Sequence, residues 1–262
     1  MKIDLILNIF YQPPKMLEDL IKHNTHLYVP MNTGNLKGAD EWCDKHLRYE
    51  TDFKENISHL NPKLNEMTSI WCYWKNLMND ADYIGFNHYR RLFRIEDLND
   101  IAEYDVVDAK PILMMFNMSY FTGSPIKSIV TTDIKSGYAI CHKIKDWNKM
   151  EALLKKTPYY VDFEDWRKQN CLTSPCNMFV MKKKIFKEYC EFIFPILFEL
   201  EKQVDFTGYD NYQKRQLSFL AERLTSLFLY SKKQQGYKFK NVDTLYFEGW
   251  KPAEATDKRG QY

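Results

Sequence analysis

The sequence lacks the local patterns by which several protein classes are recognised. It has no C-x-x-C pair, and its six cysteines form no cluster with histidine at zinc-ligand spacing. It also has no P-loop, no G-x-G-x-x-G, no H-E-x-x-H and no Ser-His-Asp order. These absences narrow the possible enzyme classes, and we expect reduced thiols, as in a cytosolic protein.

Long apolar runs and an excess of one charge are missing too. The N-terminal run MKIDLILNIF is short and contains Asp4, so we expect a first strand there and neither a signal peptide nor a membrane span. Lys plus Arg (37) nearly balances Asp plus Glu (35), which is too even for the basic surface that duplex nucleic acid needs. We therefore expect a cytoplasmic protein that does not bind nucleic acid.

What is present is enough apolar and aromatic material for a large core. The chain has 262 residues, of which 45% are hydrophobic and 16% aromatic. An aromatic surplus of this size fits either an aromatic-rich core or stacking platforms for sugars or bases. No repeat or linker is visible, so we expect one domain over residues 1–250 and a charged, flexible tail over residues 251–262.

Apolar runs alternate with helical periodicity along the chain. We expect strands at residues 3–9, 26–30, 83–86, 104–107, 112–116 and 175–181. We expect helices at residues 15–23, about 65–78, 139–154, 183–204 with an interruption at Pro195, and 212–230. Residues 39–61 are polar and give no regular pattern. Alternating strands and helices indicate an α/β fold with a sheet flanked by helices.

The densest polar cluster follows the apolar strand Y-I-G-F. It consists of Asn87, His88, Tyr89, Arg90 and Arg91. Open α/β sheets present ligands at the carboxyl ends of their strands, and arginine forks bind phosphate oxygens in pairs while an imidazole donates or shuttles a proton. The cluster indicates a phosphate or diphosphate site. The alternative is a structural role, in which one arginine pairs with a buried carboxylate and the other is solvated.

The D-x-D pattern Asp80-Ala81-Asp82 resembles the metal motif of nucleotide-sugar transferases, but it precedes the strand. Carboxylates that hold a metal on a diphosphate should follow the strand, so we assign Asp80 and Asp82 to the end of a helix and the start of the strand. The position of the metal ligands is taken by His88, Arg90 and Arg91. We expect no metal, with fixed cations stabilising the diphosphate instead.

Two carboxylates are candidates for a catalytic base. Glu222 lies among apolar residues of a predicted helix, either in an ion pair with Arg215 or Arg223 or as the base. Glu66 begins a helix and is either a first-turn charge or the base.

Two further polar residues have alternative readings. His142 lies either on a helix surface or in an acceptor site. Asn177 either satisfies buried backbone groups or hydrogen-bonds a sugar hydroxyl.

The segment ENISHLNPKLNEMTSIWCYWKNLMNDADYIGFNHYRRLF resembles a family of bacterial cell-surface polysaccharide glycosyltransferases long catalogued as a domain of unknown function. Two later segments, NMFVMKKKIFKEYCEFIFPILFELEK and YQKRQLSFLAERL, resemble its other blocks, so the resemblance covers residues 55–230. Relatives usually carry a T-H-K-like triplet where this chain has Asn8 to Tyr11, and a glycine at Ser218.

The resemblance implies a variant GT-A nucleotide-sugar fold without D-x-D, and site residues at the matching positions. The donor and diphosphate contacts that it implies are Asn56, His88, Tyr89, Arg90, Arg91 and Arg223. The acceptor or sugar contacts that it implies are Asn177, Tyr212 and Arg215, to which we add His142 from the sequence itself. The catalytic candidates are Glu222, Glu66 and His88.

The expected function is glycosyl transfer in capsule or O-antigen synthesis. A sugar, with galactofuranose favoured, would pass from a UDP donor to a saccharide or lipid-linked glycan acceptor with inversion and without a metal. The aromatic and Lys-rich helix at residues 183–200 suggests peripheral contact with the inner face of the membrane, or else core packing. The alternative function is a non-catalytic carbohydrate-binding module.

Overall fold

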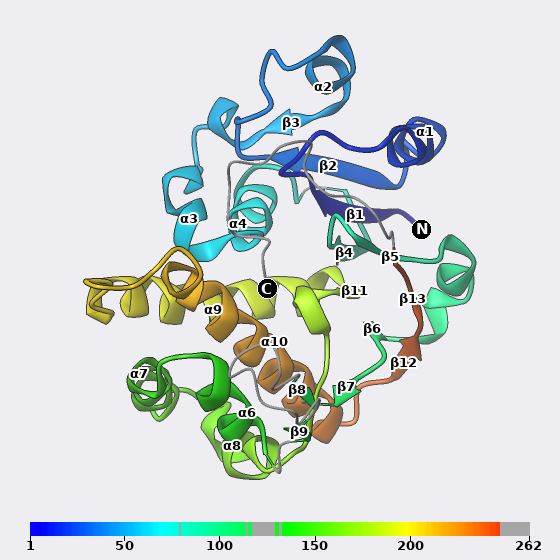
Figure 1. The fold of residues 1–262 in the computed structure, drawn as a ribbon. Coiled ribbons are helices and arrows are strands. Elements are labelled where there is room, and N and C mark those ends of the chain that lie inside the picture. Colours follow the sequence, from blue (N-terminus) through cyan, green and yellow to red (C-terminus); the bar gives the residue numbers. More distant parts are fainter. Residues whose placement is uncertain (79, 114, 117–128, 131–132, 247–262) are drawn as a thin grey trace.

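The computed structural model describes residues 1–78, 80–113, 115–116, 129–130 and 133–246. Its centre is a seven-stranded mixed sheet in the order β12-β6-β11-β4-β1-β2-β3 (Figure 1). These strands are β1 (Ile3–Asn8), β2 (Tyr28–Asn32), β3 (Arg48–Tyr49), β4 (Tyr83–Asn87), β6 (Val106–Ala109), β11 (Phe179–Lys182) and β12 (Phe239–Val242). The predicted α/β class with a sheet flanked by helices is confirmed.

Parallel strands β3, β2, β1 and β4 form one half of the sheet. β1 pairs with β2 at Leu5 and Tyr28 and with β4 at Ile3 and Tyr83. β11 then runs antiparallel to both β4 and β6, and β12 is parallel to β6. The carboxyl ends of β1 and β4 therefore lie side by side, as parallel pairing requires.

Alternation along the strands gives the sheet two apolar faces. Ile6, Ile84 and Phe179 pack into the core cluster that includes the long helices, whereas Leu5 and Val180 pack into a second cluster on the other face. Gly85 is required in β4, because a Cβ there would lie 2.7 Å from Leu5 Cδ2 and 2.8 Å from the carbonyl oxygen of Phe179.

The helices of the N-terminal half are α1 (Lys15–His23), α2 (Glu41–His46), α3 (Asn61–Leu64) and α4 (Met67–Asn76), and those of the C-terminal half are α6 (Ile134–Cys141), α7 (Ile144–Leu154), α8 (Tyr160–Arg167), α9 (Lys183–Gln203) and α10 (Gln216–Gln234). Short strands pair as β13 (Thr244–Tyr246) with β5 (Arg91–Phe93), β10 (Cys171–Leu172) with β7 (Ile112–Leu113), and β8 (Met115–Phe116) with β9 (Ile129–Val130). Six 3₁₀ turns complete the described elements: η1 (Glu50–Asp52), η2 (Ser58–Leu60), η3 (Ile95–Leu98), η4 (Ile101–Glu103), η5 (Pro175–Asn177) and η6 (Gln213–Arg215).

Several sequence expectations are wrong in detail. The helix expected at residues 139–154 is broken, because His142 and Lys143 adopt extended backbone between α6 and α7. Residues 175–177 form the turn η5 and not the start of β11. Pro195 lies inside a continuous α9. Residues 39–61, expected to be irregular, contain α2 and β3, and the expected tail from residue 251 lies outside the described residues.

The apolar residues of α9 are packed in the core, among them Phe186, Ile193 and Leu197. Core packing therefore explains the apolar face that suggested membrane contact. No helix in the described part of the chain is both long and apolar enough to cross a membrane.

Candidate active site

The polar cluster after β4 forms a tight reversal of the chain. His88 bridges to Arg91, whose backbone N–H donates to the His88 carbonyl at 2.9 Å, and β5 begins at Arg91. Asn87 fixes the reversal, because its Oδ1 accepts the Phe93 backbone N–H at 3.0 Å. The other amide atom of Asn87, Nδ2, is buried and has no hydrogen-bond partner in the described part of the chain. The turn thus places residues 88–91 at the carboxyl end of β4.

His88 is a neutral imidazole in this turn. Burial lowers its pKa well below the ordinary value, and the positive charges of Arg91, Arg90 and Arg215 lower it further. Its Nδ1 accepts the Arg90 backbone N–H at 3.3 Å, so Nε2 carries the proton. The expectation that His88 is a fixed cation is therefore wrong; it can donate one hydrogen bond, while the two arginines supply the positive charge.

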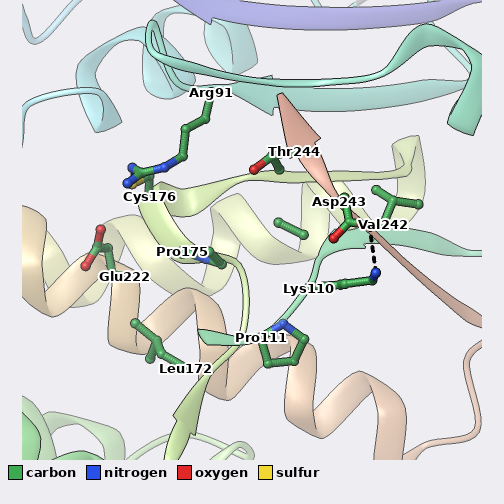
Figure 2. A pocket seen from close by; sticks show the side chains of 11 residues that line it. Arg91, Lys110, Pro111, Leu172, Pro175, Cys176, Glu222, Val242, Asp243 and Thr244 are labelled. Carbon is green, nitrogen blue, oxygen red and sulfur yellow. Dashed lines mark hydrogen bonds and ion pairs between the residues drawn. The ribbon is translucent and has the colours of Figure 1, made fainter. Parts of the chain in front are cut away.

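The two arginines have different surroundings. Arg91 Nη1 lies 2.7 Å from Cys176 Sγ, which joins the turn after β4 to η5 (Figure 2). The Arg90 guanidinium lies over the Tyr89 ring at 5.1 Å, and its Nε is buried without a partner among the described residues. Tyr89 contacts Tyr11 with ring centroids 5.9 Å apart, so the segment after β1 closes against the turn after β4.

Glu222 and Arg223 form an ion pair on α10. Arg223 Nη1 donates to Glu222 Oε2 at 2.9 Å and to the Phe219 carbonyl at 3.0 Å, and its guanidinium lies over the Tyr138 ring. The ion pair expected for Glu222 is confirmed. Arg223 is only 6% exposed in its side chain, and its contacts hold Glu222 in place.

Glu222 faces a cavity of about 310 Å³ that it shares with Arg91 and Cys176 (Figure 2). Cys176 is a neutral thiol there, because burial, with the charge of Glu222 as the second cause, raises its pKa to about 12. A cation from the β4 turn and a carboxylate from α10 therefore meet at one cavity, although they are 131 positions apart in sequence.

Glu66 belongs to a buried chain of hydrogen bonds next to this cavity. Asn177 Nδ2 donates to Glu66 Oε1 at 2.8 Å, and Asn177 Oδ1 accepts from Thr225 Oγ1 at 2.8 Å. Burial raises the pKa of Glu66 to about 7, and the negative charge of Glu222 adds to the shift. Glu66 is thus a buried carboxyl and not a solvated first-turn charge.

Asn177 links two buried side chains in this structure. Its Nδ2 bonds Glu66 and its Oδ1 bonds Thr225, and neither of these bonds is to a backbone group. The sugar contact stays a prediction. Its backbone has φ of 57°, and Ser174 and Cys176 also have positive φ. This strained turn carries no glycine, and it is what aims Asn177 at Glu66 and Cys176 at Arg91.

His142, Tyr212 and Phe219 form a stack beside α10. The His142 ring lies 4.2 Å from Phe219 and 5.7 Å from Tyr212 between centroids. His142 is 9% exposed, so the helix-surface alternative is wrong. Burial lowers its pKa well below the ordinary value, and Arg223 and Arg215 lower it further. Nδ1 has no partner among the described residues.

Arg215 and Asn56 lie in local contacts. With the Asn65 amide turned so that its oxygen faces Arg215, that oxygen accepts from Nε at 2.7 Å and from Nη2 at 3.0 Å. Asn56 bonds the Phe53 carbonyl and the Ser58 hydroxyl at the start of η2. These bonds of Asn56 are those of a turn-stabilising residue, and none of them joins it to the turn after β4.

The D-x-D carboxylate Asp82 lies at the amino end of β4, as expected. Its Oδ2 accepts the Lys2 backbone N–H at 2.7 Å, and the N-terminal ammonium is 3.8 Å away. Within the described ranges, no group of three or more His, Cys, Asp or Glu side chains is arranged to hold a metal ion.

Sequence reasoning missed Cys176 and the residues at the far side of the cavity. All six cysteines are free, as expected, but no spacing in the sequence points to a contact between Cys176 and Arg91. Lys110 and Asp243, which line the same cavity and pair at 2.7 Å, are even further apart in sequence.

The structure of the chain is similar to the apo structure of the WbbM bifunctional glycosyltransferase, with a TM-score of 0.72, 21% sequence identity, and coverage of 95% of this chain and 46% of that chain. At this identity the match shows the fold alone, and this chain spans less than half the length of that protein. No curated protein was found to match the sequence.

A family model also matches residues 17–234, which is most of the chain. The model carries the description "Domain of unknown function (DUF4422)". The chain therefore belongs to this DUF4422 family.

Proposed function

We propose that the chain is a glycosyltransferase of cell-surface polysaccharide synthesis that uses a UDP-sugar donor. The observation that carries the proposal is the meeting of Arg91 and Glu222 at one cavity beside the turn after β4. A diphosphate leaving group needs positive charge and hydrogen-bond donors, and an acceptor hydroxyl needs a base. The fold shared with part of a bifunctional glycosyltransferase supports the same reading.

In the proposed reaction, the acceptor oxygen displaces UDP in one step with inversion. Glu222 takes the proton of the acceptor hydroxyl, the oxygen forms a bond to the anomeric carbon, and the bond between that carbon and the diphosphate oxygen breaks. The electron pair of the broken bond leaves with UDP, which Arg90 and Arg91 stabilise and to which His88 donates a hydrogen bond. Arg223 holds Glu222 in place through the 2.9 Å ion pair.

Glu66 is the second candidate for the base. Its pKa of about 7 would leave half of the carboxyl ionised at neutral pH, which suits a base. However, its Oε1 accepts from Asn177 and the residue is only 9% exposed. Glu222 lines the cavity and Glu66 does not, so Glu222 remains the first choice.

Two guanidiniums carry the charge of one divalent ion, so we propose that the reaction needs no metal. Galactofuranose is the favoured donor sugar and a saccharide or lipid-linked glycan the acceptor; both rest on the family resemblance. We further propose a cytoplasmic location. Because the apolar face of α9 is packed in the core, contact with anionic membrane would have to come from its lysines, and failure to co-sediment with anionic vesicles at low salt would remove that part of the proposal.

The test is transfer from UDP-galactofuranose to a galactose-terminated acceptor, followed by mass spectrometry of the product. A mass increase of one hexose that requires both substrates supports the proposal. The alternative, a non-catalytic carbohydrate-binding module, predicts saccharide binding without any affinity for UDP. Absence of UDP binding in a thermal-shift or calorimetric titration would favour that alternative.

A further inference from the structure

The cavity beside Glu222 extends away from the turn after β4. Figure 2 shows Arg91, Cys176 and Glu222 at one end and Lys110 with Asp243 at the other. Its volume of about 310 Å³ lies at the lower limit of small-molecule sites. The cavity is therefore larger than the reacting groups at its Glu222 end require.

The rest of the cavity lining is mostly apolar, and none of it is aromatic. It consists of Ala109, Pro111, Leu172, Pro175 and Val242, together with the polar Thr244. Carbon-bound hydrogens on the face of a sugar ring pack against such aliphatic walls, while the ring hydroxyls seek polar groups at the edge. The aromatic residues that suggested stacking platforms take no part in this lining; most of them pack with one another.

The far end carries a polar pair suited to hydroxyl groups. Lys110 Nζ lies 2.7 Å from Asp243 Oδ2, and the two side chains are 57% and 64% exposed. An ion pair this exposed contributes little to stability. Together the ammonium donates and the carboxylate accepts hydrogen bonds, and their charges cancel, which matches a neutral polyol better than a phosphate or an acidic sugar.

We propose that this extension is the acceptor subsite, where a neutral saccharide lies with one ring face on Pro175 and its neighbours and with hydroxyls on Lys110 and Asp243. The proposal rests on the proposed function, because the acceptor hydroxyl must reach Glu222. It places the acceptor between α10 on one side and the segments after β6 and β12 on the other. Lys110 and Asp243 then determine acceptor specificity without touching the donor.

The experiment measures saccharide and UDP binding separately. The saccharide probe is a galactose-terminated disaccharide, titrated by saturation-transfer NMR in the presence of saturating UDP, and UDP itself is titrated by calorimetry. The variants are Lys110→Ala, Asp243→Asn and the double variant. The matched control is Lys168→Ala. Lys168, just after α8, forms a similarly exposed ion pair with Asp165 of that helix, with 3.3 Å between Nζ and Oδ1.

We expect each single variant to weaken disaccharide binding about fivefold and the double variant about tenfold or more, which is the range for loss of one or two hydrogen bonds. UDP affinity should change less than about twofold, and Lys168→Ala should leave both constants unchanged. Equal disaccharide affinity in the double variant and the wild type would overturn the acceptor subsite. So would failure of the wild type to bind the disaccharide while it binds UDP, or a loss confined to UDP affinity.

The failure of the proposed function has a different signature. In that case the wild type does not bind UDP at all, whatever the variants do to the disaccharide. Thermal unfolding of each variant checks that the fold is intact, which we expect because both side chains are more than half exposed.

Discussion

The two ends of strand β4 carry polar groups in opposite situations. At the amino end, Asp82 is exposed and its carboxylate accepts the Lys2 backbone N–H at 2.7 Å. At the carboxyl end, Asn87 Nδ2 and Arg90 Nε are buried and lack partners among the described residues. Buried polar groups in native proteins nearly always have a partner. The polar groups at the amino end thus have local partners, whereas two at the carboxyl end have none among the described residues, which is consistent with the donor site that we propose there.

Electrostatics differ between the ends as well. Burial, and then the charges of Arg91 and Arg90, lower the pKa of His88, so the carboxyl end combines two cations with a neutral donor. A metal ion there would be repelled, while a diphosphate would be attracted. The D-x-D motif, at the other end of the strand, has a local structural use at Asp82.

The largest expected effect comes from removing a cation at the carboxyl end. Arg90→Ala should lower turnover about 30-fold to 1000-fold, since such a contact to a developing diphosphate is worth ~2 to 4 kcal/mol. Asp82→Ala, the control at the amino end, should change turnover less than about twofold. Initial rates and melting temperatures of both variants check this. Unchanged kinetics in Arg90→Ala with a large drop in melting temperature would mean that the arginine is structural.

The second largest effect on turnover is expected from removing the proposed catalytic base. Glu222→Gln keeps the shape of the side chain and should lower turnover about 100-fold or more while UDP affinity stays nearly constant. Glu66→Gln, made in parallel, should have the smaller effect. The reverse order in single-turnover rates would assign the base to Glu66, and full activity in both variants would place the base elsewhere.

Much of the comparison between the ends of β4 could be predicted from the sequence. Tyr83 to Phe86 is an apolar run bounded by Asp82 and by Asn87, so both the strand and the polarity of its ends follow from adjacent residues. α1 was predicted with the bounds that the structure has. These features are local, and local patterns decide them.

The partners across the cavity could not be predicted in this way. The contact between Arg91 and Cys176 depends on a turn in which Ser174, Cys176 and Asn177, none of them glycine, adopt positive φ. No residue type in this stretch of the sequence predicts that turn. The break at His142 is hidden too, because neither proline nor glycine marks it. Its cause is tertiary: the imidazole stacks on Phe219 of α10, which overrides local helix propensity.

A smaller effect concerns a buried carboxyl beyond the carboxyl end of β1. Glu50 is fully buried, its Oε1 accepts from Ser69 at 2.6 Å, and burial raises its pKa to about 7. The folded state therefore holds the proton more tightly than the unfolded chain, so Glu50 lowers stability as pH rises from about 4.5 to about 7, and the loss is constant at higher pH.

Glu50→Gln should remove that cost. Relative to the wild type, the free energy of unfolding of the variant should rise by about 2 kcal/mol between pH 5 and pH 8. Urea unfolding at both pH values measures the difference. A difference that does not change with pH would contradict a buried, protonated Glu50 and would remove its contrast with the exposed Asp82.

The smallest expected effect tests the chain that holds Asn177. Thr225→Val deletes the hydroxyl that donates to Asn177 Oδ1 at 2.8 Å and also contacts Tyr189 Oη at 2.9 Å. We expect a loss of about 1 to 2 kcal/mol in unfolding free energy, with Thr225→Ser as the control that keeps the hydroxyl. A loss of the same size in Thr225→Ser, which keeps the hydroxyl and lacks only the methyl group, would mean that the effect is not specific to the hydroxyl.

The central claim is that the carboxyl end of β4 binds the donor diphosphate through Arg90, Arg91 and His88 without a metal. Calorimetric titration of UDP in excess EDTA tests it most directly, with the wild type, Arg90→Ala and Asp82→Asn compared in one buffer. We predict that the wild type and Asp82→Asn bind equally well, that added Mn²⁺ changes neither, and that Arg90→Ala binds at least tenfold more weakly. Binding that is lost in EDTA, restored by Mn²⁺ and abolished by Asp82→Asn would contradict the account.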